Sequence, residues 1–366
     1  MNDPIRFLFA VCQVGAEAAL KAEIARRWPD FNLAFSRPGF ATFKLPDNHK
    51  LAIDFDLGST FARTYGFSLG NVHGKDGTQL ADQLWQIVGE REIHHLHVWQ
   101  RDSALPGEKG FEPGITPLAN EIGDAVASRD PAGRSLKVNR TARSGQVVLD
   151  CVLVEPAEWW FGIHRASSRP SRWPGGVCRV KAPDHALTRA YAKMEEAIRW
   201  SQLPIRAGDH CAEIGSSPGG AVQTLLDRGM HVTGIDPAEM DESILAHPRF
   251  VHLRQRGREV RKKMFHDTRW LFADSNVAPK HTLDTVEDIV THDEVHVRGL
   301  LLTLKLLDWK LADEIPEYIA RVRSWGFSFV KARQLAFNRQ EFCIAALRNR
   351  AMRRVRLRKK SASTKS

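Results

Sequence analysis

The chain has 366 residues, of which 43% are hydrophobic and 26% charged, which is typical of a globular protein with two or three domains. No apolar run approaches the roughly 20 residues of a membrane-spanning helix, and the start of the chain lacks the basic region and cleavage site of a signal peptide. We therefore expect a cytoplasmic protein without a membrane partner. The five cysteines include no C-x-x-C pair, which excludes a disulfide framework and a zinc knuckle and predicts reduced, buried thiols.

The formal net charge of +10 predicts a polyanionic partner. Residues 348–360 alone carry eight arginines and lysines and no acid, so we assign 348–366 to a basic C-terminal tail. Such a tail can neutralise phosphates without reading a base sequence. The alternative is a tail that only improves solubility.

Two small α+β modules are predicted before residue 179. In the first, residues 1–75, hydrophobic periodicity predicts a helix at 15–28 and strands at 5–14, 40–46 and 60–70. In the second, residues 76–178, it predicts helices at 76–90 and 115–130 and strands at 93–102, 135–140 and 145–155.

The segment 158–176, EWWFGIHRASSRPSRWPGG, mixes tryptophan, phenylalanine, histidine and arginine with residues typical of loops. Aromatic rings can stack on bases while arginines hold phosphates, so this composition suits an RNA-contacting surface. It suits a packed linker between domains equally well, and both interpretations stay open.

From about residue 180 the pattern alternates between strands and helices, which predicts a parallel sheet. Strands are expected at 210–215, 231–236, 250–253, 270–274, 299–307, 327–335 and 341–347. Only AFNRQ separates the last two strands, so they should form an antiparallel hairpin. A mostly parallel seven-stranded sheet with such a hairpin is typical of Rossmann-like methyltransferases, and we assign this α/β domain to residues 179–347.

The stretch EIGSSPGG, residues 213–220, follows the first strand of this domain. Ser217 stands where a dinucleotide-binding loop has its second glycine, the position at which the backbone must approach a pyrophosphate. A cofactor without phosphates, S-adenosylmethionine, therefore fits better. Pro218 is expected in the first turn of the following helix, because a backbone N–H there has no partner within the helix and proline loses nothing by lacking one.

The remaining groups of this turn match the parts of S-adenosylmethionine. Glu213 can accept from the ammonium, Gly215 allows the tight turn, and the N–H groups of Gly219 and Gly220 can donate to the carboxylate. Asp236, at the end of the second strand, can accept both ribose hydroxyls. The alternative is an ordinary strand-turn-helix without a ligand.

Three ionisable residues lie in or at the ends of predicted strands, namely Asp274, Lys305 and Glu341, and a fourth, Lys193, lies upstream of the first strand in RAYAKMEEAIRW. A lysine inside an apolar strand such as GLLLTLKLL is costly unless it is paired. The carboxyl ends of the central strands of a doubly wound sheet converge on the ligand crevice. We therefore expect Asp274 and Lys305 to meet over the cofactor.

These motifs, EIGSSPGG, GID, ADSNVAP, LTLK and RQEF, resemble those of the FtsJ-type 2′-O-ribose RNA methyltransferases. The resemblance is greatest to the branch that methylates a cytidine of bacterial large-subunit (23S) ribosomal RNA. It implies a ferredoxin-like module over 1–75 and a THUMP-type RNA-binding module over 76–178. It also implies a contact between Thr188 and the cofactor and a catalytic tetrad of Lys193, Asp274, Lys305 and Glu341.

The implied reaction is methylation of a ribose 2′-hydroxyl in RNA with S-adenosylmethionine. Lys305 acts as the base, because burial and the neighbouring Lys193 favour its neutral form, while Asp274 and Glu341 orient it. No metal is required. The alternative is a catalytically inactive RNA-binding or ribosome-assembly protein that retains the fold. A small-molecule or protein methyltransferase would leave the N-terminal modules without a role.

The sequence departs from the family pattern at three positions. Glu213 replaces the usual aspartate, and Ala221 replaces an aromatic residue that often follows the two glycines. Arg256 stands in the turn after the third strand, where the family has an aspartate near the adenine amino group. An arginine cannot accept a hydrogen bond from that amine.

Two histidine motifs are interpreted as incidental. HDEVH, residues 292–296, places two histidines four residues apart but lacks the glutamate position of H-E-x-x-H, and we expect it on an exposed helix face. HHLH, residues 94–97, is expected to be a chance cluster on a strand.

Overall fold

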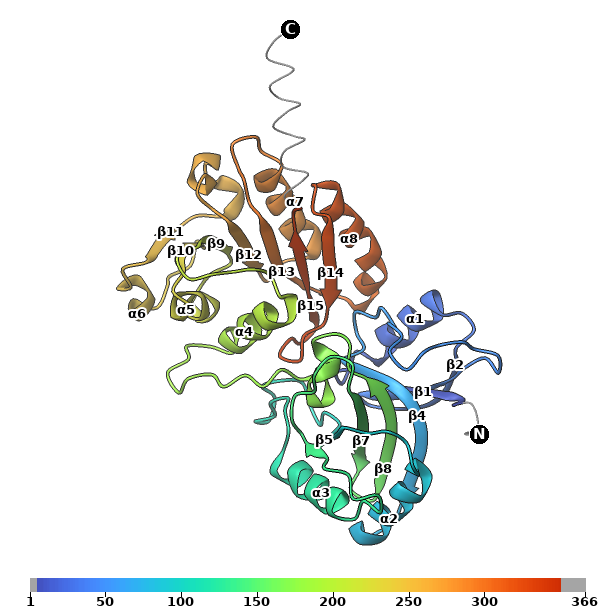
Figure 1. Ribbon diagram of the computed structural model, residues 1–366. Coiled ribbons are helices and arrows are strands. Elements are labelled where there is room, and N and C mark those ends of the chain that lie inside the picture. Colours follow the sequence, from blue (N-terminus) through green and yellow to red (C-terminus); the bar gives the residue numbers. More distant parts are fainter. Residues whose placement is uncertain (1–4, 350–366) are drawn as a thin grey trace. The chain divides into compact units, whose positions relative to one another are not determined.

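The computed structural model describes residues 5–349. It divides the chain into two compact units, with the division between Arg179 and Val180 (Figure 1). Most of the predicted basic tail, residues 350–366, lies outside the described residues. No helix in the described part of the chain is long and apolar enough to cross a membrane. All five cysteines are free and buried, as predicted.

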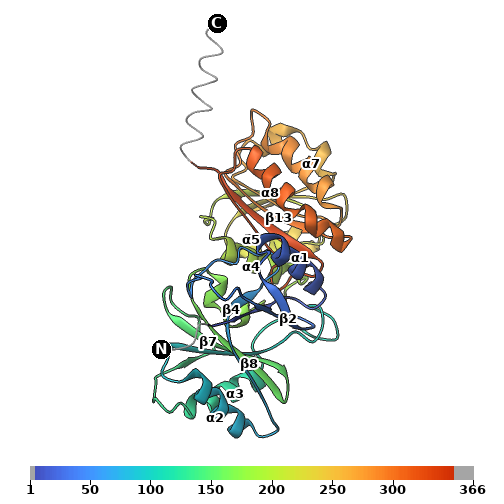
Figure 2. The same ribbon diagram turned by 90° about the vertical axis from the view of Figure 1, so that its right-hand side faces the viewer.

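The N-terminal unit contains one eight-stranded sheet with the strand order β2-β3-β1-β4-β8-β7-β5-β6. Its elements are β1 (Phe7–Val11), α1 (Glu17–Arg27), β2 (Asn32–Arg37), β3 (Phe40–Lys44), β4 (Thr64–His73), α2 (Gly77–Val88), β5 (His95–Gln100), α3 (Pro117–Ser128), β6 (Lys137–Val138), β7 (Val147–Glu155) and β8 (Glu158–Arg165). Helices α2 and α3 pack side by side (Figure 2). The two predicted modules thus share one sheet, because β4 pairs with β1 on one side and with β8 on the other.

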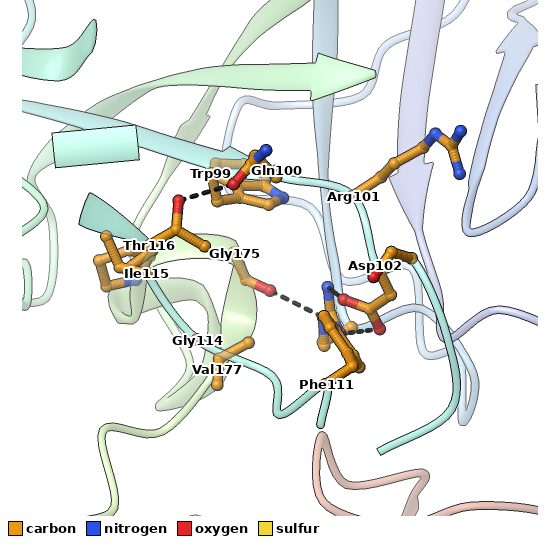
Figure 3. Close-up of a pocket in the computed structure, with 13 residues that line it drawn as sticks. Trp99, Gln100, Arg101, Asp102, Phe111, Gly114, Ile115, Thr116, Gly175 and Val177 are labelled. Carbon is orange, nitrogen blue, oxygen red and sulfur yellow. Dashed lines mark hydrogen bonds and ion pairs between the residues drawn. The ribbon is translucent and has the colours of Figure 1, made fainter. Parts of the chain in front are cut away.

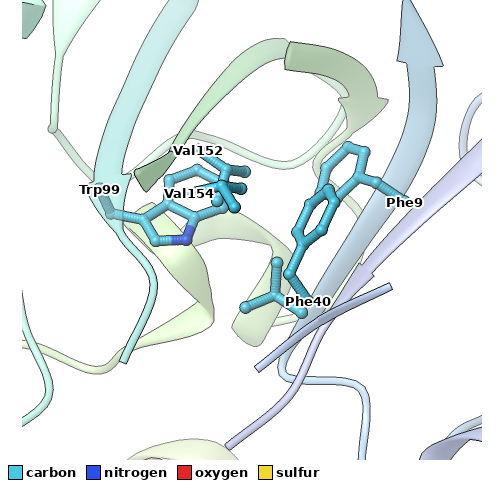
Figure 4. Close-up of a cluster of buried hydrophobic side chains, with 6 residues drawn as sticks. Phe9, Phe40, Trp99, Val152 and Val154 are labelled. Carbon is cyan, nitrogen blue, oxygen red and sulfur yellow. The ribbon is translucent and has the colours of Figure 1, made fainter. Parts of the chain in front are cut away.

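The core of this unit also crosses the predicted module boundary. Phe9 and Phe40 come from the first module, and they face Trp99, Val152 and Val154 from the second (Figure 4). Each of these five side chains is at most 2% exposed, so they form one desolvated cluster.

The segment 158–176 is part of this packing. Residues 158–165 form β8, and the side chains of Trp159 and Trp173 are 3% and 7% exposed. Trp160 stacks against Phe35, with the ring centroids 4.8 Å apart. Trp159 and Trp173 are buried and not free to stack on bases, so the interpretation as an RNA-contacting surface is wrong for these two rings.

The C-terminal unit contains a seven-stranded sheet with the order β11-β10-β9-β12-β13-β15-β14. Its strands are β9 (His210–Ile214), β10 (His231–Ile235), β11 (Phe250–Leu253), β12 (Trp270–Asp274), β13 (Gly299–Lys305), β14 (Phe329–Arg333) and β15 (Glu341–Leu347). β9 to β13 pair in parallel, whereas β15 runs antiparallel to both of its neighbours. The hairpin expected from the short AFNRQ link is therefore present.

Helices cover both faces of this sheet. The helices are α4 (Ala190–Ser201), α5 (Gly220–Asp227), α6 (Glu242–Leu245), α7 (Pro279–Val290) and α8 (Ile315–Ser324). Figure 1 shows α4 and α5 on one face, with α7 and α8 on the other. This is a Rossmann-like α/β arrangement, in which the carboxyl ends of the parallel strands form one edge of the sheet.

Three local predictions for this unit need correction. Pro218 precedes Gly219, the N-cap of α5, and so lies before the first helical turn. HDEVH follows α7 in a turn and not on a helix face, because α7 already ends at Val290. Arg348 belongs to the folded unit and not to the tail. Its guanidinium donates to the carbonyl oxygen of Val290 at 2.7 Å and lies over the ring of Phe327.

Candidate active site

The four predicted tetrad residues converge at the carboxyl ends of β12 and β13. Lys193 projects from α4, Asp274 ends β12, Lys305 ends β13 and Glu341 begins β15. The β13–β15 register places Lys305 directly opposite Glu341, so the antiparallel hairpin brings the fourth member to the site.

Each lysine of this tetrad contacts both carboxylates. Lys193 Nζ lies 2.8 Å from Asp274 Oδ2 and 2.8 Å from Glu341 Oε1. Lys305 Nζ lies 3.3 Å from Asp274 Oδ1 and also pairs with Glu341 Oε2. The four side chains are each 5–17% exposed, so two cations and two anions balance one another in a largely dry site.

The electrostatics of the tetrad give its members different roles. Burial alone would lower the pKa of Lys193, but Asp274 and Glu341 outweigh burial and raise this pKa above its ordinary value. Burial alone would raise the pKa of Glu341, but Lys193 and Lys305 hold it below its ordinary value. Lys193 is therefore a cation and Glu341 an anion at neutral pH.

Two residues that the sequence did not single out position Glu341. Glu196 is fully buried on α4, and its carboxylate accepts the N–H groups of Ala336 and Phe337 at 3.0 Å each. These bonds fix the link between β14 and β15. Within that link, Asn338 Nδ2 donates to Glu341 Oε1 at 3.2 Å. No sequence pattern could have found Glu196, because its partners are backbone groups 140 residues away.

Glu213, the acid of the glycine turn, is buried at the end of β9. It is 0% exposed, and neither carboxylate oxygen has a hydrogen-bond partner in the described structure. Burial raises the pKa of this carboxyl well above its ordinary value. Repulsion from Asp274 and Asp236 raises the pKa further, and attraction to Lys193 lowers it only in part. A buried acid without a partner is costly, so its retention indicates a ligand that supplies a donor.

The glycines of the turn leave space that side chains would fill. Gly215 has a φ of +81°, and a Cβ there would lie 2.5 Å from the carbonyl oxygen of Asp274. Gly219 has a φ of +125°, which side chains rarely adopt. A Cβ at Gly220 would collide with Oγ1 of Thr188, so Thr188 lies against the turn.

Asp236 follows β10 beside the same turn. Its carboxylate accepts the N–H of Ser217 at 3.2 Å and that of Ala238 at 2.9 Å. Ser217 Oγ in turn donates to the carbonyl oxygen of Glu239 at 2.6 Å. The carboxylate is thus held at the carboxyl end of the sheet with acceptor capacity left over. The two carboxylates beside the turn are hydrogen-bond acceptors, so they fit a ligand whose donors are an ammonium and a diol.

Comparison with protein families agrees with this geometry. Residues 186–366 match the family model described as FtsJ-like methyltransferase. The chain contains an FtsJ-like methyltransferase domain. The resemblance deduced from the sequence motifs is thus confirmed.

Curated proteins similar to this chain carry the name "Ribosomal RNA large subunit methyltransferase M". The relative from Laribacter hongkongensis is 26% identical over 309 residues, which cover 81% of this chain and 83% of the relative. The relative from Pseudomonas putida is 34% identical over 128 residues, which cover 33% of this chain and 36% of the relative. A Burkholderia thailandensis N1-methyltransferase structure with S-adenosylhomocysteine is 14% identical, with a TM-score of 0.34, and covers 45% of this chain and 79% of its own.

Arg256 lies in the turn after β11 of the FtsJ-like domain, as expected from the sequence. Its side chain is exposed, and its backbone N–H donates to Oε2 of Glu259 at 3.3 Å. A carboxylate thus stands three residues after the position at which the family has its aspartate.

A separate cavity of about 120 Å³ lies in the N-terminal unit, away from the tetrad in sequence. Asp102 is at one side of it, and Thr116 donates to Gln100 at the other (Figure 3). Arg63 forms a bidentate pair with Asp102, at 2.6 and 2.9 Å, and also donates to the carbonyl oxygen of Gly175. These charges neutralise one another, which is typical of a structural ion pair.

The HHLH cluster is structural as well. His95 and His97 are buried on β5, and both rings bond the carbonyl oxygen of Arg140, at 3.1 and 2.8 Å. Burial lowers the pKa of His97 to about 3, so this ring is neutral. Within residues 5–349, no group of three or more histidine, cysteine or acidic side chains is arranged to hold a metal ion.

Proposed function

We propose that this protein transfers a methyl group from S-adenosylmethionine to a ribose 2′-hydroxyl of large-subunit ribosomal RNA. The observation that carries the proposal is the tetrad, in which Lys193 and Lys305 share Asp274 and Glu341 at the carboxyl edge of the sheet. The names of the curated relatives support ribosomal RNA as the substrate.

The glycine turn supplies the groups that hold the cofactor. Glu213 accepts from the ammonium, Asp236 accepts from the ribose hydroxyls, and Gly219 and Gly220 offer backbone N–H groups to the carboxylate. Thr188, packed against Gly220, closes the turn from the other side. When bound, S-adenosylmethionine supplies a methyl group activated by the sulfonium.

The tetrad prepares the 2′-hydroxyl as a nucleophile. A hydroxyl is a poor nucleophile until a base accepts its proton. Lys193 remains a cation and permanently balances one of the two carboxylates. Lys305 is then the amine that can accept the 2′-hydroxyl proton, while Asp274 and Glu341 orient it and stabilise the resulting ammonium. Orientation of the hydroxyl toward the methyl group supplies much of the remaining acceleration.

We assign the N-terminal unit to RNA binding, as a ferredoxin-like module followed by a THUMP-type module, and the protein to the cytoplasm. The strand order β4-β1-β3-β2 with α1 supports the first assignment. One departure is that residues 45–63 contain no helix, although a full β-α-β-β-α-β unit has one there.

Methyl transfer to unmodified large-subunit ribosomal RNA tests the proposed function. We expect label from S-adenosyl-[methyl-³H]methionine to appear in one 2′-O-methylated nucleoside after digestion. Lys305→Ala should lose several orders of magnitude in rate with cofactor affinity nearly unchanged. Binding of RNA without any transfer by the wild-type protein would contradict the proposal and favour an inactive RNA-binding protein. Label on a base or on protein would also contradict it.

A further inference from the structure

A cationic segment follows β11 in the FtsJ-like domain. Residues 254–263, RQRGREVRKK, contain six arginines and lysines and one acid, and we call this segment the basic loop. It accounts for half of the net charge of +10 of the whole chain. Such a density of like charge within ten residues is unfavourable unless a counter-charge is present.

The basic loop is anchored to the domain. A Cβ at Gly257 would lie 3.0 Å from Thr285 of α7 and 3.1 Å from Ile214, the last residue of β9. Val260 is 2% exposed and Phe265, just beyond the loop, is 1% exposed. The loop therefore has a fixed course along the domain and does not depend on a ligand for its shape.

Two of the six cations have structural partners. Arg254 donates to Glu239 Oε1 at 3.1 Å and to the carbonyl oxygen of Pro237 at 3.3 Å. Lys262 pairs with Asp288 of α7. These contacts help to fix the course of the loop but leave most of its charge unbalanced.

The other four cations are exposed, and no acid within the described residues forms a salt bridge with any of them. They are Arg256, Arg258, Arg261 and Lys263. Because the backbone between them is anchored, their spacing is already set before a partner binds, which reduces the entropy lost on binding.

The position of the loop links it to the proposed active site. Gly257 packs against Ile214, and the next residue, Gly215, begins the cofactor turn and lies against Asp274 of the tetrad. The loop therefore starts at the carboxyl edge of the sheet, the edge that carries the tetrad. An extended polyanion that enters the active site from this side would pass the four exposed cations.

We propose that the basic loop binds the phosphate backbone of the substrate RNA next to the active site. This inference rests on the proposed function, and it identifies the part of the catalytic domain that holds the RNA strand. Arginine guanidinium groups bind phosphate oxygens bidentately, and they do so without reading bases. The loop therefore contributes affinity and register, while the choice of nucleotide lies elsewhere.

The test compares two triple variants of the full chain. In the loop variant, Arg258, Arg261 and Lys263 become glutamine. In the control variant, three exposed cations elsewhere in the same domain become glutamine: Arg206, Arg323 and Lys331. Arg206 and Arg323 precede β9 and β14 at the amino end of the sheet, and Lys331 lies in β14, at the edge opposite β11. Both variants remove the same charge.

Binding of a fluorescein-labelled 20-nucleotide single-stranded RNA is measured by anisotropy from 50 to 200 mM salt. Each phosphate contact contributes about 0.7 to the slope of log affinity against log salt, so the loop variant should lose about 2 units of slope. The control variant should keep the wild-type slope. Affinity for S-adenosylmethionine and Tm should be unchanged in both, and Arg261→Gln alone gives a smaller shift of about 0.7 if the triple variant is unstable.

A wild-type slope in the loop variant, or an equal loss in both variants, overturns the proposal. This outcome does not depend on whether the proposed function is correct, because RNA binding is measured directly and methyl transfer is not. If the wild-type protein transfers no methyl group to ribosomal RNA but the loop variant still loses slope, only the proposed function fails.

Discussion

The unpartnered carboxyl of Glu213 leads to a prediction about both stability and cofactor binding. In the ligand-free protein this group is fully buried without a hydrogen bond, and its pKa is well above the ordinary 4.5. Its stabilising contribution is therefore fully present below pH 4.5 and is lost as the pH rises through the folded-state pKa. Over that interval the unfolding free energy should fall by up to about 1.4 kcal/mol per pH unit from this group.

Cofactor binding should reverse this penalty. An ammonium beside Glu213 favours the carboxylate, so binding should release up to one proton and tighten as the pH rises. Glu213→Gln keeps the shape but removes the charge. Loss of a hydrogen bond to a charged group costs about 1.5 to 3 kcal/mol, so affinity should fall roughly 10- to 150-fold. The free variant should be as stable as the wild type at neutral pH, or more so.

Calorimetry in buffers of different ionisation enthalpy measures the released proton directly. Glu242→Gln, at an exposed carboxylate of α6 in the same domain, is the matched control and should change neither affinity nor proton release. If binding releases no proton, or if Glu213→Gln binds S-adenosylmethionine as tightly as the wild type, Glu213 does not hold the ammonium.

Three further changes test other parts of the molecule. Arg256→Asp restores an acceptor in the turn after β11 and should tighten S-adenosylmethionine binding by on the order of 1 kcal/mol, the net contribution of one hydrogen bond. Weaker binding by calorimetry would show that Arg256 itself contacts adenine or RNA. Glu196→Gln leaves one of the two buried N–H groups of the β14–β15 link without an acceptor, so the unfolding free energy should fall by about 1 to 3 kcal/mol and methyl transfer should be slower. A chemical denaturation curve identical to that of the wild type would contradict this. Truncation after Asn349 removes the eight arginines and lysines of 350–366, so RNA affinity should fall and its salt dependence should flatten. An unchanged affinity at low salt would exclude the tail as an RNA contact.

The strands of the catalytic domain could be located from the sequence because each is a short apolar run between turn residues. WLFAD and EFCIAAL coincide with β12 and β15 residue for residue. In the N-terminal unit, β2 was missed because NLAFSR lies mostly at the surface and shows no alternation of buried and exposed positions. β8 was missed because the mixture of aromatic, arginine and loop residues in 158–176 suits a nucleic-acid surface or a packed linker and does not indicate a strand, whereas most of the side chains of β8 pack inside the unit.

Three members of the tetrad could be predicted because they are charged residues at strand ends, where apolar neighbours make a charge conspicuous, whereas Lys193, in α4, was assigned through the family resemblance. The residues that support the tetrad could not be predicted. Glu196 lies in a helix whose other residues include several charges, and only the folded structure shows its carboxylate receiving two backbone N–H groups. Likewise, the sequence indicates that Glu213 is an acid at the end of a strand, but not that its carboxylate has no hydrogen-bond partner among the described residues.

Glu196 and Glu213 therefore contribute differently to stability and to ligand binding. Glu196 is buried with its donors present, so it stabilises the fold whether or not a ligand is bound. Glu213 is equally buried, but no residue within 5–349 donates to it, so its burial is unfavourable until a ligand arrives. Binding energy that relieves such a penalty is available only to a ligand with a cation at that position. The same unpaired carboxyl that weakens the free protein therefore selects an ammonium-bearing cofactor over an uncharged analogue of equal shape.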